Sequence, residues 1–239
     1  MQKHRSVEED KGHLMYSFYI ACFSVLLLWG IRALEVGLES KFYWLGIYPR
    51  TLKGLFGLIG SGLVHKDIFH LASNSLPLFM GVFMTIYYYR KIAMEVFLWI
   101  YFSCNLWVWV LARPAYHIGI SGFIYGILSF LFFSGIFRRN RRLMTVSLII
   151  VFMYGSMIWG VLPIKDGVSW ESHAAGAIVG LILAFYFRRV GKLKMTHEEN
   201  PLHYWTNTND SSITPIVFHY SIDEKKIDIS NNEEENLTL

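Results

Sequence analysis

Two stretches of this sequence decide how its helices pack: residues 119–126 read GISGFIYG, and residues 173–180 read HAAGAIVG. Each stretch contains two glycines four residues apart, namely Gly122 and Gly126, and Gly176 and Gly180. Small residues at this spacing lie on one face of a helix and let two helix backbones approach closely. The pattern predicts two tightly packed helices that bring Ser121 and His173 within reach of each other.

The rest of the chain has the composition of a membrane protein. Of its 239 residues, 54% are hydrophobic and 17% are charged, and the mean hydropathy is +0.36. Soluble domains are about 45–50% apolar and about 25% charged. Six segments approach the roughly 20 apolar residues that cross a bilayer: residues 14–31, 68–89, 92–112, 115–137, 143–164 and 170–187. We therefore expect an all-α polytopic membrane protein with a bundle of six transmembrane helices.

Basic residues predict the orientation of this bundle, because short cytoplasmic loops carry an excess of Lys and Arg. With the N-terminus inside, the inside segments hold 13 basic residues and the outside segments hold seven. Both termini are then cytoplasmic. Net charge also divides the chain, since residues 1–190 carry +9 and residues 191–239 carry −5. The expected parts are a cytoplasmic N-terminal segment (1–13), a membrane domain (14–188) and a polar, acidic cytoplasmic tail (189–239).

Polar side chains inside membrane helices are costly, so each is a candidate for a functional site. Four lie in the first turns of the second, fourth and sixth predicted helices: His70, Asn74, Ser121 and His173. These three helices run parallel in a six-helix topology, which places the four groups at a similar depth near the outer face. His70 and Asn74 are four residues apart and share one helix face. Gly119 and Gly122 flank Ser121 and permit a tight turn at the start of its helix.

Serine and histidine in one place suggest nucleophilic catalysis. A serine hydroxyl becomes a nucleophile when a base takes its proton, and neutral histidine is the common base. The tetrahedral intermediate needs hydrogen-bond donors, which His70, Asn74 and the backbone at Ser121 can provide. The sixth segment has an acidic residue, Glu171, only at its water-facing start, where it suits the helix dipole. We therefore expect a Ser–His dyad without a third carboxylate.

Three sequence blocks occur in a fixed order on these helices: His65 with His70-Leu71-Ala72-Ser73-Asn74, then Gly119-Ile120-Ser121-Gly122, then His173-Ala174-Ala175-Gly176 with Gly180. This order is similar to that of the rhomboid family of intramembrane serine proteases. The resemblance implies a six-helix endopeptidase that cuts transmembrane segments of substrate proteins near the outer face. It implies Ser121 as nucleophile, His173 as general base, oxyanion donors at His70 and Asn74, and a Tyr125 ring packed against His173. Many members carry a Trp-Arg pair in the first loop, where residues 55–58 here read LFGL.

The expected partners are transmembrane helices of substrates and the lipid bilayer, and no cofactor or metal is expected. The basic residues cluster beside hydrophobic segments, and no Gly-rich phosphate loop follows a strand, which argues against nucleic acid and nucleotides. A metal site needs three or four convergent ligands, and no carboxylate cluster accompanies His65 and His70. The compact six-helix form suits a bacterial inner membrane.

Each of these residues also has a simpler interpretation. Ser121 alone could ease helix packing, and His173 alone could line a pore. His65 could support the loop above the site or lie at the membrane surface. The competing function is a catalytically silent rhomboid-like protein that binds client helices, or a small transporter. The presence of both Ser121 and His173 argues against the first, and the lack of related internal halves argues against the second.

Overall fold

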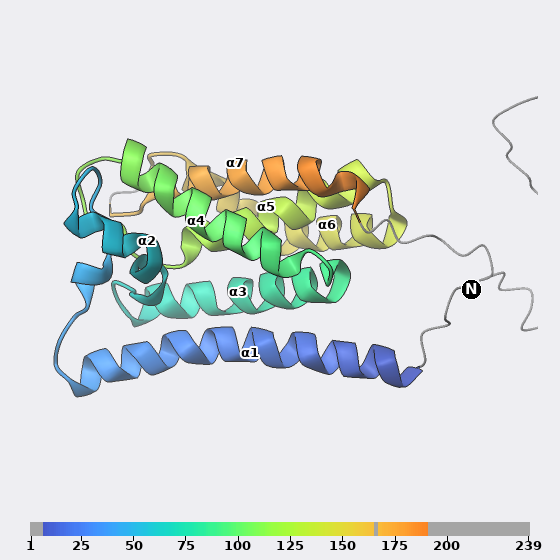
Figure 1. The fold of residues 1–239 in the computed structure, drawn as a ribbon, viewed down its shortest axis with the longest axis horizontal. Helices are drawn as coiled ribbons and strands as arrows, with labels where there is room; N and C mark the ends of the chain where they lie inside the picture. Colours follow the sequence, from blue (N-terminus) through green and yellow to red (C-terminus); the bar gives the residue numbers. More distant parts are fainter. Residues whose placement is uncertain (1–6, 165–166, 191–239) are drawn as a thin grey trace, which may run out of the picture. The chain divides into compact units, whose positions relative to one another are not determined.

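The structure of the protein is a computed structural model that describes residues 7–164 and 167–190. Most of the predicted tail (189–239) and the first six residues lie outside the described residues. Five helices are long and apolar enough to cross a bilayer: α1 (Val7–Gly37), α3 (Ile68–Tyr89), α4 (Ala93–Leu111), α5 (Ser121–Arg138) and α7 (Trp170–Tyr186). The axes of α1, α3, α5 and α7 run roughly along the horizontal direction of Figure 1, and α4 crosses the view at a slant. The expected all-α polytopic membrane fold is confirmed.

The count of six transmembrane helices is not confirmed, because the fifth predicted segment is not one long α-helix. Residues 143–164 fall on α6 (Arg141–Tyr154) and on the 3-10 helix η4 (Gly155–Val161). Fourteen residues of α-helix span about 21 Å, which is less than the roughly 30 Å of the hydrocarbon core. Hydropathy indicates which residues leave water, but it does not distinguish an α-helix from a 3-10 helix. The change from α6 to η4 therefore could not be predicted from the hydropathy pattern.

Two predicted segments begin at different residues from the helices that contain them. α1 starts at Val7 rather than at residue 14, because a helix satisfies its own backbone hydrogen bonds and continues beyond the apolar region. α5 starts at Ser121 rather than at residue 115. The apolar residues before it form a loop in which Ile47 and His117 exchange two backbone hydrogen bonds of 2.9 and 2.8 Å. The residues before α5 are apolar because their loop packs on the loop between α1 and α3.

α5 and α7 form the most extensive helix pair of the structure. A Cβ atom on Gly176 would overlap the carbonyl oxygen of Gly122, and one on Gly180 would overlap that of Gly126. We call these four residues the glycine interface. Because backbone atoms of one helix occupy the space that side chains would need, the two helices approach as closely as their main chains allow.

The loop between α1 and α3 is built from short helical turns: η1 (Tyr43–Leu45), η2 (Lys53–Phe56), α2 (Gly57–Gly60) and η3 (Ser61–Leu63). The Arg50 guanidinium donates hydrogen bonds to the carbonyl oxygens of Ala112 (2.9 Å) and Val110 (3.2 Å), at the C-terminal end of α4. Asn105 of α4 donates to Leu58 O at 3.0 Å. The loop is thus attached to α4 beside the segment that leads to α5.

A cavity of about 530 Å³ lies on the other side of α5, between α1, α3 and α4. Its walls are almost entirely apolar and include Phe23 of α1, Val82 of α3, Phe97 of α4 and Phe123 of α5. Neither Ser121 nor His173 lines it. The side of α5 that faces α1 is therefore more loosely packed than the side that faces α7.

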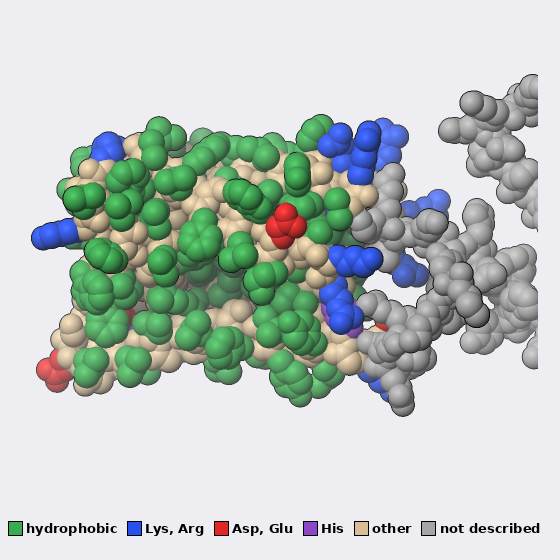
Figure 2. Space-filling model, in the orientation of Figure 1, with side chains coloured by type: hydrophobic (Ala, Val, Ile, Leu, Met, Phe, Trp, Pro, Cys, Tyr) green, Lys and Arg blue, Asp and Glu red, His purple; other side chains and the backbone are tan. Residues whose placement is uncertain are grey.

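Lys and Arg side chains gather at the end of the bundle where α1 begins, and apolar side chains cover the flank between the two ends (Figure 2). α3, α5 and α7 finish at this end, and the basic residues there include Lys11, Arg90, Lys91, Arg138, Arg139, Arg141, Arg142, Arg188 and Arg189. We call it the basic end. The starts of α3, α5 and α7 lie at the opposite end, which carries the four predicted polar residues.

Candidate active site

Ser121 and His173 are in direct contact at the end of the bundle opposite the basic end. Ser121 is the first residue of α5, and His173 lies in the first turn of α7. Ser121 Oγ and His173 Nε2 are 2.8 Å apart, and both side chains are buried. The glycine interface continues directly from this contact along the two helices, so the close approach of α5 and α7 is what allows the side chains to meet.

The other ring nitrogen of His173 determines which nitrogen carries the proton. His173 Nδ1 lies 2.9 Å from the carbonyl oxygen of Gly160 in η4. A carbonyl oxygen can only accept a hydrogen bond, so Nδ1 carries the proton. Nε2 then has a free lone pair and accepts a hydrogen bond from the Ser121 hydroxyl. This is the arrangement in which an imidazole can take the proton of a serine.

The His173 ring is held on its face as well as at its edge. The Tyr125 ring stacks on it with a centroid distance of 4.1 Å and an angle of 9° between the planes. A Cβ atom on Gly160 would overlap the Tyr125 hydroxyl, so a glycine is needed where η4 passes this stack. Sequence reasoning missed Gly160, because a backbone carbonyl has no side-chain signature. The only available signal was a glycine between the large residues Trp159 and Val161.

α3 places His70 beside the segment that leads into α5. The Asp67 side chain accepts the backbone N–H of His70 at 2.8 Å, which caps the start of α3. A Cβ atom on Gly119 would lie 2.8 Å from His70 Cε1, and Gly119 has a φ of +104°. Only glycine satisfies both conditions.

Within the described residues, unpaired hydrogen-bond donors lie near the starts of α3 and α5. Asn74 is buried one turn after His70, and its Nδ2 has no partner among the described residues. The N–H groups of Ser121 and Gly122 begin α5 and have no acceptor within that helix. A buried donor without a partner is costly, and it is expected where a ligand or a transient charge completes the site.

His65 lies in the loop between α1 and α3 and is buried, with 2% of its surface accessible. Its ring lies 5.2 Å from that of His70. Burial is the main cause that lowers the pKa of His65 to about 4, so the ring is neutral at pH 7. Over residues 7–164 and 167–190, no three His, Cys, Asp or Glu side chains come together as a metal site would need.

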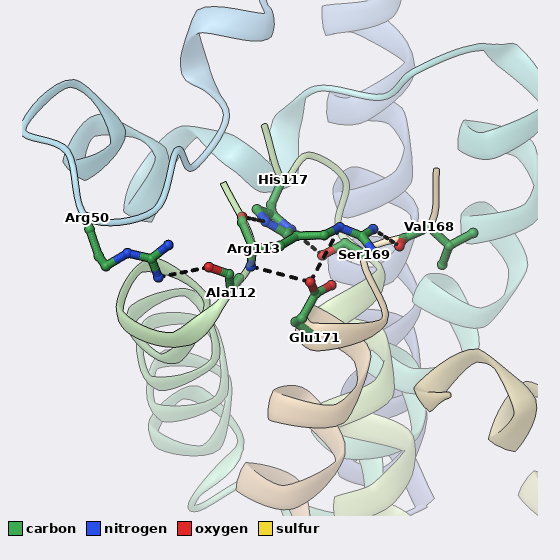
Figure 3. Close-up of polar contacts among 7 residues, drawn as sticks. All are labelled: Arg50, Ala112, Arg113, His117, Val168, Ser169 and Glu171. Carbon is green, nitrogen blue, oxygen red and sulfur yellow. Dashed lines mark hydrogen bonds and ion pairs between the residues drawn. The ribbon is translucent and has the colours of Figure 1, made fainter. Parts of the chain in front are cut away.

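A polar network joins the segment after α4 to the start of α7 (Figure 3). Arg113 Nε lies 3.5 Å from Glu171 Oε1, and its guanidinium donates to Val168 O at 2.6 Å. His117 contacts Ser169 in the same network. Glu171 therefore pairs with Arg113 and does not hydrogen-bond the His173 ring. Neither Arg113 nor His117 was predicted as a site residue, because neither belongs to one of the three sequence blocks.

These observations define a helical, multi-pass membrane protein with a buried Ser–His pair near one end of the bundle. A family model described as Rhomboid domain matches residues 53–190, more than half of the chain. An uncharacterized protein of Mycobacterium tuberculosis is 32% identical over 175 residues, which cover 67% of this chain and 71% of the relative. One from Mycobacterium leprae is 29% identical over 166 residues, covering 62% and 63%. The chain belongs to the rhomboid family, whose members are generally intramembrane serine proteases.

Proposed function

We propose that this protein is an intramembrane serine endopeptidase in which Ser121 is the nucleophile and His173 the general base. The observation that carries the proposal is the 2.8 Å contact between Ser121 Oγ and His173 Nε2. His173 Nε2 is unprotonated because the ring proton lies on Nδ1, which donates to the Gly160 carbonyl oxygen. Gly160 takes the orienting position that a carboxylate has in a Ser–His–Asp triad. Tyr125 prevents the ring from tilting away.

The reaction follows from this geometry. Ser121 Oγ attacks the carbonyl carbon of the scissile peptide bond while its proton passes to His173 Nε2. The C–N bond breaks, and the leaving amine takes that proton from His173. Water then attacks the acyl-enzyme, gives its proton to the same Nε2, and releases the second product as the Ser121 hydroxyl re-forms. No metal, nucleotide or other cofactor enters these steps.

The negative oxygen of each tetrahedral intermediate needs donors that are already in place. We assign this role to Asn74 Nδ2, the His70 ring and the backbone N–H of Ser121. The unpartnered Asn74 amide supports the assignment, because its cost in the resting protein is recovered when charge develops beside it.

The substrates we propose are transmembrane helices of other proteins. A helical peptide bond shields its carbonyl and is expensive to open in lipid, so cleavage is expected where a substrate helix is locally weak. The cut lies near the face opposite the basic end, because the pair is at the starts of α5 and α7. We place the basic end and both termini in the cytoplasm, on the positive-inside rule, and the protein in a bacterial inner membrane.

The test is labelling of the detergent-purified full chain with a fluorophosphonate serine probe, together with cleavage of a model transmembrane substrate. Wild type is expected to be labelled and to cleave, and Ser121→Ala and His173→Ala are expected to do neither. Ser129→Ala is the matched control, since Ser129 lies two turns further along α5 and its hydroxyl donates only to Ala177 O, at 2.7 Å.

The outcome also separates the competing functions. If well-folded wild type is neither labelled nor able to cleave, the protease proposal is wrong. Client-helix binding that survives in that protein would then favour a catalytically silent rhomboid. If Ser121→Ala still cleaves the substrate at the wild-type rate, another residue is the nucleophile.

A further inference from the structure

His117 joins the two segments that carry Ser121 and His173, outside the contact between those residues. It lies four residues before Ser121, and its backbone pairs with Ile47 of the first loop. Its ring crosses to the segment before α7, where Nδ1 lies 2.6 Å from Ser169 Oγ (Figure 3). His117 is 4% exposed. A buried side chain therefore connects the start of α5 to the start of α7 from above.

The second contact of His117 determines its tautomer. Nε2 lies 3.1 Å from the carbonyl oxygen of Arg113, which can only accept, so Nε2 carries the proton. Nδ1 is then an acceptor, and the Ser169 hydroxyl donates to it. The direction of this hydrogen bond is set by the ring's other partner, as it is in His173.

The Ser169 side chain contacts His117 and does not cap the start of α7. Ser169 directly precedes α7, where a serine normally caps the helix by accepting an N–H of the first turn. Its side chain forms no such hydrogen bond. Its carbonyl oxygen, however, accepts the backbone N–H of His173 at 3.3 Å and that of Ser172 at 3.1 Å. Ser169 is thus bonded to His117 through its side chain and to His173 through its backbone.

We propose that His117 is a positioning residue that sets the distance between Ser121 and His173 through Ser169. The glycine interface brings α5 and α7 together below the pair, and the His117–Ser169 hydrogen bond holds their starts together above it. The inference rests on the proposed protease function. Catalysis is sensitive to this distance, since a displacement of about 1 Å can cost about 100-fold in rate.

The test uses two amide variants of His117. Each keeps one of the two hydrogen bonds that the ring makes, either with Ser169 or with Arg113 O. In His117→Asn the side-chain oxygen occupies the position of Nδ1 and can still accept from Ser169. In His117→Gln the amide nitrogen reaches the position of Nε2 and can still donate to Arg113 O, while the contact with Ser169 is lost. We expect His117→Asn to keep a kcat near that of wild type. We expect His117→Gln to lower kcat about tenfold with little change in KM.

Ser169 variants test the same contact from the other side. Ser169→Ala should lower kcat as much as His117→Gln, Ser169→Thr should restore it, and the double variant His117→Gln/Ser169→Ala should lose no more than either single variant. A residue that only stabilises the loop would lower the melting temperature in both amide variants and leave kcat below that temperature unchanged.

Equal loss of kcat in His117→Asn and His117→Gln, wild-type kcat in His117→Gln, or additive losses in the double variant would overturn the inference. These outcomes differ from failure of the proposed function itself, which would show as well-folded wild type that neither labels nor cleaves, or as cleavage that persists in Ser121→Ala. If His117→Gln does not fold, the Ser169→Ala and Ser169→Thr pair decides the question.

Discussion

The two sides of α5 are packed in opposite ways. Toward α7, glycines face glycines and backbone meets backbone. Toward α1, large apolar side chains line a cavity of about 530 Å³. Of the membrane-crossing window of α5, 56% is buried inside the protein, whereas for α1 the share is 17%. Glycine-to-glycine packing of α5 thus lies at the interface that continues into the Ser121–His173 contact.

This difference has a physical reason. Two helices carrying side chains that must meet at hydrogen-bond distance cannot be held apart by bulky residues, so their interface needs glycine. A helix that only closes the bundle toward lipid has no such requirement. Gly30 of α1 illustrates this, because it is exposed and a Cβ atom there would have nothing within 4 Å. The same residue type is therefore essential at the interface between α5 and α7 and replaceable on the exposed side of α1.

The largest effect is expected from Gly176→Ala. The new methyl group would overlap the Gly122 carbonyl, and because that atom is backbone it cannot move without shifting α5. We expect a loss of about 3 kcal/mol of stability and loss of fluorophosphonate labelling. Thermal unfolding in detergent and labelling rates measure both. Wild-type labelling in this variant would mean that the two helices tolerate separation.

A pH effect of similar size is expected at His65, in the loop layer above the tight side of α5. Its folded-state pKa of about 4 lies below the ordinary value of 6.5, so below pH 6.5 the unfolded chain binds a proton that the folded chain does not. Stability is full above pH 6.5 and falls as the pH drops toward 4, by about 3 kcal/mol in total.

The measurement is the melting temperature of wild type and His65→Gln between pH 7 and pH 4, because Gln does not titrate. His117, whose pKa is also lowered by burial, is present in both proteins and cancels in the comparison. The wild-type curve should fall more steeply. Parallel curves would show that His65 is not the group that titrates.

A smaller effect is expected from Arg50→Ala, which removes two hydrogen bonds from the carbonyl oxygens at the end of α4. The guanidinium is exposed to water, so we expect a loss of only about 1 kcal/mol. Lys53→Ala is the matched control, since it removes an equal charge from the same loop and the Lys53 side chain has no hydrogen bond to any of the described residues. If both variants melt alike, charge rather than the α4 contact accounts for the change.

The smallest effect is expected from Gly30→Ala in α1. Alanine favours a helix over glycine by up to about 1 kcal/mol, and here the added methyl group meets no neighbour. The melting temperature should stay the same or rise slightly, with an unchanged labelling rate. A clear loss of stability would show that the exposed side of α1 at Gly30 is not free to accept a methyl group, and the contrast with Gly176→Ala would weaken.

Much of the fold could be predicted from the sequence. Five of the six predicted segments contain a helix long enough to cross a bilayer, because a long apolar run has few alternatives to a helix in lipid. The spacing of the four glycines indicated which helices pack closely. The predicted site residues Ser121, His173, Tyr125, His70 and Gly119 lie close together, and their functional roles stay predictions.

The sequence by itself determined which residues leave water and which helix faces carry small or polar groups, because periodicity depends only on local chain geometry. Tertiary structure alone decided the rest. The Gly160 carbonyl that orients His173, the change of helix type at η4 and the contact between His117 and Ser169 all depend on segments distant in sequence. The position of a backbone oxygen cannot be predicted from side-chain patterns. The distance between the starts of two helices is determined only once the loops that connect and cover them have folded.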